Sequence, residues 1–249
     1  MNAILVRVGI DQAFGGWNAP VDSSTGAFVY VPIPEIPTDF HPGCRRTLGE
    51  FLPALARFCG SCECESELRL RPPCDARASD HPVHLDPDFD HLTYGDDGQH
   101  RGAKIAKLVC DDLLVFYAGL RPCGPYADKL MYAIVGLYVV DEVVPIREIP
   151  AERWHENAHT RRIPHSDWPD DFVVRARAGQ SGRLDKCIPI GECRERAYRV
   201  RDDLLKEWGG LSVKNGYIQR SAVPPCFLHP ERFLAWFKKQ AVGLVARNS

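Results

Sequence analysis

The sequence has no apolar run long enough to cross a membrane, and its first residues lack the basic region, sustained apolar core and cleavage site of a secretory signal. It also lacks an excess of positive charge, since 31 Lys and Arg stand against 33 Asp and Glu. These absences predict a cytoplasmic protein that does not enter membranes and is not an indiscriminate DNA binder. Any contact with nucleic acid should be local and selective.

Several familiar site motifs are also missing. The glycine loop 179–183 lacks the Lys-Ser/Thr ending of a nucleotide P-loop and the G-x-S-x-G pattern of hydrolases. The alternating acids Asp86, Asp88 and Asp90 lack the Gly and Glu of an EF-hand loop. They offer the oxygen ligands that Mg²⁺ prefers, but such a pattern is equally typical of a solvated loop, and we predict no metal ligand here.

Ten cysteines in a chain of this size without a signal sequence favour reduced thiols. Cys59, Cys62, Cys64 and Cys74 have metal-like spacing, but no second Cys-x2-Cys pair follows them. The simpler interpretation is a variable surface insertion at about 60–84 within a single domain of residues 1–249. Whether the four cysteines bind zinc is left open.

Two hydrophobic runs, Leu113–Ala118 and Tyr132–Val140, form the best strand pair, with a bulge or close backbone approach expected at Gly136. Residues 3–10, 28–33 and 172–177 are further predicted strands, the second at a sheet edge because of its prolines. Apolar periodicity and end signals predict helices near 47–59, 192–208 and 230–241. The pattern as a whole predicts an α+β fold.

The central pair, Asp112-Leu-Leu-Val-Phe-Tyr117 followed by Ala133-Ile-Val-Gly-Leu-Tyr-Val-Val140, resembles the paired strands of PUA-like modules such as the EVE and ASCH domains. This resemblance implies a mixed sheet or partly open β-barrel. It also implies a pocket for a nucleic-acid base, often a modified one, at the barrel mouth.

The wider chain resembles the third of the nucleotide-modification-associated domain families, whose setting is bacterial and phage DNA modification. The resemblance rests on segments spread over nearly the whole chain: 4–9 with Asp11 and 17–20, 30–35, 86–89, 93–96, 157–162, 181–183 and 208–221. It implies a role in nucleic-acid base modification and brings no established reaction with it.

Two segments carry the candidate catalytic residues. Asp11 follows the first strand in a glycine-containing loop, where sites often lie, although a turn in which Asp11 satisfies its own backbone is the plainer alternative. The segment 154–162 gathers one Asn, two His and two Arg, which suits an anionic group but also a solvated helix. If chemistry occurs, we predict Asp11 and His159 as its acid and base.

In the preferred interpretation, a base is presented singly, stacks on an aromatic ring and is read by amide side chains, while arginines hold phosphates. The predicted stacking residues are Trp17, Tyr94 and Tyr117; the amides are Asn18, Asn157 and Gln219; the phosphate-binding arginines are Arg161, Arg162 and Arg183; and Ser181, Arg220 and Ser221 add polar contacts.

The function predicted from the sequence is therefore recognition or modification of a nucleic-acid base in DNA hypermodification. One alternative is an enzyme acting on a free nucleotide or sugar nucleotide that supplies the modification. Another is a non-catalytic scaffold that binds partner proteins of a modification or defence system. The sequence leaves open whether the chain is an enzyme and which cofactor it uses.

Overall fold

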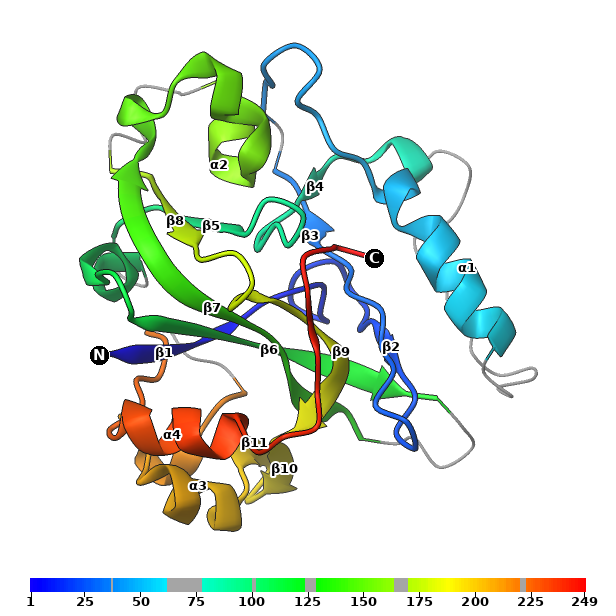
Figure 1. Ribbon diagram of the computed structural model, residues 1–249. Helices are drawn as coiled ribbons and strands as arrows, with labels where there is room; N and C mark the ends of the chain where they lie inside the picture. Colours follow the sequence, from blue (N-terminus) through cyan, green and yellow to red (C-terminus); the bar gives the residue numbers. More distant parts are fainter. Residues whose placement is uncertain (37, 62–77, 100–101, 124–128, 164–169, 220–222) are drawn as a thin grey trace.

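The computed structural model describes residues 1–36, 38–61, 78–99, 102–123, 129–163, 170–219 and 223–249, which form a mixed α+β fold around an eight-stranded sheet (Figure 1). The strands are β1 (Ala3–Arg7), β2 (Pro20–Val21), β3 (Ile33–Pro34), β4 (Val83–His84), β5 (Thr93–Asp96), β6 (Leu113–Pro122), β7 (Met131–Pro145), β8 (Phe172–Ala176), β9 (Gly182–Pro189), β10 (Gly191–Arg194), β11 (Ala197–Val200) and β12 (Leu244–Val245). The α-helices are α1 (Leu52–Ser61), α2 (Ala158–Arg161), α3 (Asp202–Trp208) and α4 (Pro230–Phe237), and short 3-10 turns cover Leu48–Glu50, Ala78–Asp80, Gly102–Lys107, Ile146–Glu148, Ala151–Glu156 and Lys214–Gly216.

The predicted central strand pair is confirmed. β6 and β7 run antiparallel, from Leu113 opposite Val139 to Leu120 opposite Met131, and β1 pairs with β6 in parallel. The residues are buried without a break over 113–120 of β6 and 132–138 of β7, which explains why these strands read as continuous apolar runs rather than as alternating ones. The pair forms the centre of the hydrophobic core.

The bulge expected at Gly136 is also present. The register of β7 shifts here against both β6 and β9. A Cβ atom at Gly136 would lie 2.7 Å from the ring of Phe89, so only glycine allows that ring to pack onto the strand. Phe89 is fully buried and meets Phe116 and Tyr138 edge to face.

The sheet does not close into a barrel, and a PUA-like core is not confirmed. The strand order is β1-β6-β7-β8-β5, with β9 and β12 continuing from one part of β7 and β2 beside β6. The long strand β7 divides its pairing, because its first half pairs with β9 and its last residues, from Val140, pair with β8. The result among the described residues is an open mixed sheet.

The helix predicted over 192–208 is wrong in its first part. Residues up to Val200 form the β10–β11 hairpin, whose turn places Glu195 and Arg196 at positive φ, and the helix begins only at Asp202. Ala197 and Val200 fit a helical stripe and a short strand equally well, so spacing alone could not separate the two. The end is as predicted, since Gly209 terminates the helix in the left-handed conformation.

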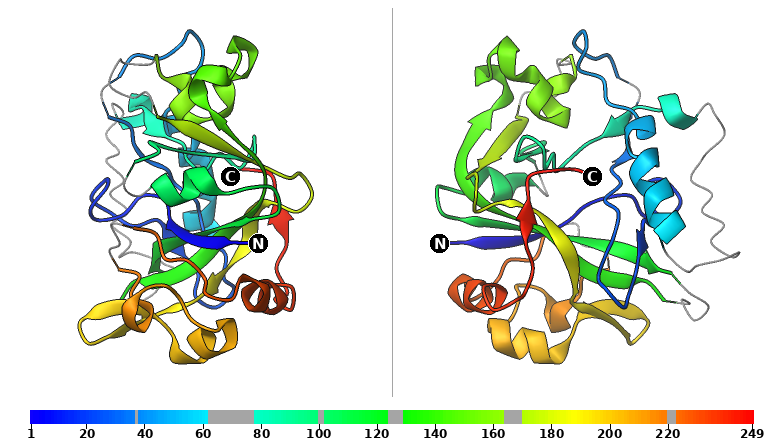
Figure 2. Two further views of the ribbon diagram at one scale, coloured as in Figure 1. Left: turned by 90° about the vertical axis from the view of Figure 1, so that its left-hand side faces the viewer. Right: turned by 45° about the vertical axis from the view of Figure 1, so that its right-hand side comes forward.

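The other two predicted helices are confirmed as α1 and α4, and α4 ends at Phe237. A 3-10 turn precedes α1, and the Glu50 side chain caps this turn by accepting the backbone N–H of Thr47. α3 and α4 pack together through Trp208, which is fully buried against Phe233 and Trp236. Both views of Figure 2 place these helices and the β10–β11 hairpin at one end of the sheet and α2 at the other. No described helix is long and apolar enough to span a membrane.

One N-terminal expectation needs correction. Residues 28–33 form no continuous strand; only a bridge between Val21 and Phe28 and the two-residue β3 are present, since Pro32 and Pro34 have no N–H to donate. The last two residues of the predicted insertion at 60–84 form β4, which pairs with β3, and the insertion itself stays a prediction. Cys62, Cys64 and Cys74 lie outside the described residues.

Candidate functional site

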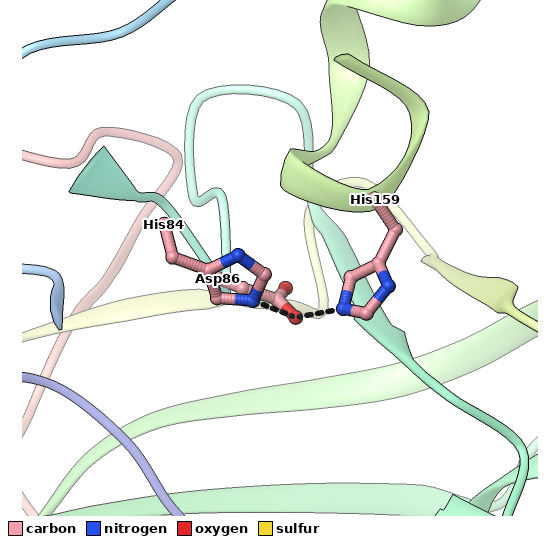
Figure 3. A group of neighbouring side chains, drawn as sticks. All are labelled: His84, Asp86 and His159. Atoms are coloured by element: carbon pink, nitrogen blue, oxygen red, sulfur yellow. Dashed lines mark ion pairs between the residues drawn. The ribbon is translucent and has the colours of Figure 1, made fainter. Parts of the chain in front are cut away.

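A cavity of about 1020 Å³ opens where the end of β1, the loop after it, β4, β5 and α2 come together. Three side chains from two distant segments meet on its wall: His84 at the end of β4 and Asp86 just after it, and His159 on α2 (Figure 3). One possible ligand atom from each lies within 4.8 Å of those from the other two.

The two imidazoles present the same atom to the same carboxylate. Nε2 of His84 and Nε2 of His159 each lie 3.9 Å from Oδ2 of Asp86, and the dashed lines in Figure 3 mark these two pairs. This distance is too long for a hydrogen bond. The three groups therefore face one another across a small gap on the cavity wall.

Each imidazole is held from behind by a second carboxylate. Nδ1 of His159 lies 2.6 Å from Oδ2 of Asp171, and Nδ1 of His84 lies 3.0 Å from Oε2 of Glu35. Arg162 pairs with Glu35 at 3.0 Å and also contacts Nδ1 of His84. At His159, a proton on Nδ1 donated to Asp171 leaves the Nε2 lone pair facing Asp86. At His84, Glu35 favours the same tautomer, whereas the guanidinium of Arg162, which can only donate, favours the proton on Nε2.

Asp86 is held in place by two hydrogen-bond donors, Gly95 and Asn157. The backbone N–H of Gly95 donates to its carboxylate at 2.9 and 3.0 Å, and the Nδ2 amide of Asn157 donates to Oδ1 at 3.2 Å. Asn157 also caps α2 by accepting the N–H of His159 at 2.9 Å. One asparagine thus positions both a carboxylate and an imidazole of the cluster.

Burial sets the protonation of these groups. It raises the pKa of Asp86 to about 7, although His159, Gly95 and Asn157 act in the opposite direction. Burial also lowers the pKa of His84 to about 4, so this ring is neutral at pH 7. Burial would raise the pKa of Glu35, but His84 and Arg162 together hold it below its ordinary value.

The cavity wall carries more negative than positive groups. The carboxylates of Asp11, Asp86, Asp96, Asp97, Asp170 and Asp171 line it, against the guanidiniums of Arg7 and Arg162. Arg7 pairs with Asp11 at 2.8 Å, and Arg162 pairs with Glu35. A neutral or cationic group therefore fits the interior better than a multiply charged anion.

One side of the cavity carries an aromatic ring open to solvent. Phe14 is 59% exposed and belongs to the loop that follows β1. Asp11 shapes this loop, since its Oδ1 accepts the N–H groups of Ala13 and Phe14 at 2.7 and 2.8 Å. The loop thus presents an apolar face to any ligand that enters the cavity.

The structure brings several predicted residues to this cavity. Asp11, Tyr94, Tyr117, His159 and Arg162 line it, and Asn157 lies directly behind the cluster. Asp11 bonds to the backbone of its own loop and to Arg7, and these contacts hold the loop in shape. The tyrosines are buried, and their hydroxyls donate to Asp96 and to the carbonyl of Ile218.

Other predicted residues lie elsewhere and hold the fold together. Trp17 packs on the core, Asn18 donates to the carbonyl of Gly119, Arg161 pairs with Asp88, Ser181 accepts from the N–H of Val139, Arg183 contacts the ring of Phe28, and Gln219 accepts from the N–H of Tyr198. Arg220 and Ser221 lie outside the described residues.

The three carboxylates of the 86–90 segment do not converge on one site. Asp88 is fully buried and bonds to Arg161, His91 and Asn248. Asp90 bonds to the same Asn248. Asp86 turns instead toward the two imidazoles. Sequence reasoning missed His84, Glu35, Asp171 and Phe14 as site residues, and the His84-Leu-Asp86 spacing was the only local signal for the cluster.

Residues 2–217 match the family model described as nucleotide modification associated domain 3. The match covers most of the chain and includes all three residues of the cluster. No curated protein and no solved structure matches the chain.

Proposed function

Since the chain belongs to the family of nucleotide modification associated domain 3, we propose that it acts on the base of a nucleotide held in the cavity beside His84, Asp86 and His159. One observation carries the proposal: two imidazoles, each anchored by a carboxylate, converge on a buried third carboxyl group at the wall of a cavity. Burying and orienting three such groups costs free energy, which is typical of a reaction centre.

The cavity suits a base better than a phosphate. Its volume of about 1020 Å³ is ample for one nucleobase, and its interior carries more carboxylates than guanidiniums. A base that swings out of a nucleic acid enters the cavity as a neutral group and leaves its phosphates outside. The substrate we favour is therefore a single base presented by DNA.

Phe14 supports the binding half of this proposal. An exposed aromatic ring beside a polar centre gives a base a surface on which to stack, worth about 1–3 kcal/mol per base. The stacked base then directs one edge toward the Nε2 atoms of His84 and His159. Stacking tolerates any base, so the polar cluster would select the atom that is modified.

A second candidate is an enzyme that acts on a free nucleotide. It is favoured by Arg7 and Arg162, which both line the cavity and carry the positive charge that phosphates require. Both arginines are paired with carboxylates, and a phosphate would have to compete with Asp11 and Glu35 for them.

The proposal is tested by fluorescence anisotropy across a salt series, with labelled single-stranded and duplex DNA that carries normal or modified bases. We expect salt-dependent binding that Phe14→Ala weakens about five- to 150-fold, the equivalent of 1–3 kcal/mol. Leu228→Ala is the matched control, because Leu228 is equally exposed but does not line the cavity.

Competition by free nucleotides separates the two candidates. Displacement of DNA only at nucleotide concentrations far above the DNA Kd supports the base of a polymer as the ligand. Tight binding of mononucleotides with no DNA binding would favour the free-nucleotide enzyme. Binding of neither ligand would contradict both candidates and leave the scaffold alternative.

A further inference from the structure

We propose that His84, Asp86 and His159 bind one divalent transition-metal ion at the wall of the cavity. This inference names the cofactor of the proposed reaction centre. Its catalytic meaning rests on the proposed function, but metal binding itself can be measured without any nucleotide.

The geometry is close to that of a three-ligand site. The two N···O distances to Asp86 are 3.9 Å, whereas an ion about 2.1 Å from each ligand in tetrahedral geometry keeps them about 3.4 Å apart. The three ligand atoms all lie within 4.8 Å of one another, so side-chain rotations that shorten these separations by about 0.5 to 1.4 Å would complete the site. Two histidines and one carboxylate leave the remaining coordination positions open for water or a substrate atom.

The outer contacts are those that metal sites use. A histidine that binds a metal usually donates its other ring N–H to a carboxylate, which fixes the ring and makes the ligand nitrogen more basic. His159 has Asp171 in this position, and His84 has Glu35. The two rings come from distant segments, yet each has the same arrangement behind it.

The facing atoms also lack a positive partner between them. The two Nε2 atoms and a carboxylate oxygen face one another, and no hydrogen bond among the described residues joins either Nε2 to Asp86. The N–H of Gly95 is shared between Oδ2 and Oδ1 of Asp86, at 2.9 and 3.0 Å, and Asn157 donates to Oδ1 alone. A cation in the gap would bond to all three atoms at once.

The ligand set selects the kind of ion. Imidazole nitrogen suits Fe, Zn, Ni and Cu, whereas Mg²⁺ and Ca²⁺ prefer sites made only of oxygen. Among the described residues, this cluster is the one group of His, Cys, Asp and Glu that comes together closely enough. A bound ion would supply a Lewis acid and positive charge where a substrate group enters the cavity.

The test uses the purified full-length chain, stripped with a chelator and titrated with Co²⁺ while its visible absorption is followed. We expect saturation at one Co²⁺ per chain, with competition by Zn²⁺ and none by Mg²⁺. His84→Ala and His159→Ala should abolish saturable binding. His229→Ala is the control and should leave binding unchanged, because His229 is an exposed residue at the start of α4 and is not part of the cluster.

Glu35→Gln and Asp171→Asn test the outer contacts, and each should weaken Co²⁺ binding about 10- to 100-fold. Circular dichroism and thermal unfolding of each metal-free variant show whether it is folded. If a histidine variant is unfolded, these two variants decide, since unchanged Co²⁺ affinity in both would overturn the proposal.

The cysteines at positions 59, 62, 64 and 74 require their own control, because thiolates also bind Co²⁺. The titration is therefore repeated after these four are changed to serine, and nitrogen and oxygen ligation should persist without a thiolate charge-transfer band. Loss of all Co²⁺ binding in that variant would overturn the proposal. Co²⁺ binding without DNA or nucleotide binding would contradict the proposed function alone, and nucleotide binding without any metal would contradict this inference alone.

Discussion

Asn157 donates its side-chain amide to Asp86 at 3.2 Å, although 71 positions separate the two residues in the sequence. Its amide oxygen accepts the N–H of His159, so the same side chain fixes the start of α2 and the orientation of the buried carboxyl group. The relative placement of Asp86 and His159 therefore depends on a residue that does not itself face the reacting atoms.

Asn157→Ala should lower the free energy of unfolding by about 2–3 kcal/mol, because it removes a helix cap and leaves a donor contact of Asp86 unmade. The measurement is urea unfolding followed by circular dichroism. Asn157→Asp keeps the cap acceptor but sets a second carboxylate beside Asp86, so its stability should fall further as pH rises from 5 to 8. Equal stability of both variants and the parent would show that Asn157 has no positioning role.

Gly95 allows the close approach of β5 to the cluster. A Cβ atom there would lie 2.4 Å from Cδ2 of His159 and 2.6 Å from Oδ1 of Asn157. Gly95→Ala should push His159 out of place, lower stability by about 1–3 kcal/mol and reduce Co²⁺ and DNA binding together. Gly119→Ala is the matched strand control, because its nearest contacts are at 3.4 Å, and it should leave binding intact.

The two central strands of this fold were readable from the sequence because their signal is local. β6 and β7 are rich in β-branched and aromatic residues, and the glycine that interrupts the second run marks the bulge. The segment before α3 was misread, because a short hairpin and a helix can share apolar residues three positions apart. The path of β7 between two partner strands depends on the whole sheet, and no local pattern encodes it.

The site was readable only in part, for a related reason. His159, Asn157 and Arg162 were predicted because polar side chains crowd into one short segment, and the structure places them at or directly behind the cavity. His84 and Asp86 sit in an acidic stretch that is typical of a solvated loop, and their role follows from contacts with α2, far along the chain. Arg161 and Arg162 are neighbours in sequence, yet one pairs with buried Asp88 and the other reaches the cavity.

Cys187 provides a test of the sheet from its thiol chemistry. Burial in β9 raises the pKa of its thiol to about 12, whereas Cys110 and Cys193 are exposed. Because the folded state holds this proton more firmly, ionisation of Cys187 would cost stability only as pH rises above about 9 toward 12. Alkylation at pH 8 followed by peptide mass analysis should modify Cys110 and Cys193 and spare Cys187. Rapid labelling of Cys187 in the folded protein would contradict this packing of β9.

Substitutions of Asp11 and Phe14, alone and together, measure whether Asp11 affects binding through the loop or through direct contact with the ligand. Asp11 holds the loop by accepting the N–H of Phe14 and pairing with Arg7, so its effect on binding should act through the position of the ring. We expect Asp11→Ala and Phe14→Ala each to weaken DNA binding, and the double variant to be little weaker than Phe14→Ala alone. Anisotropy titrations of the four proteins give this coupling directly. Additive losses would show that Asp11 contacts the ligand independently of the loop, as an acid or base at the reacting base would.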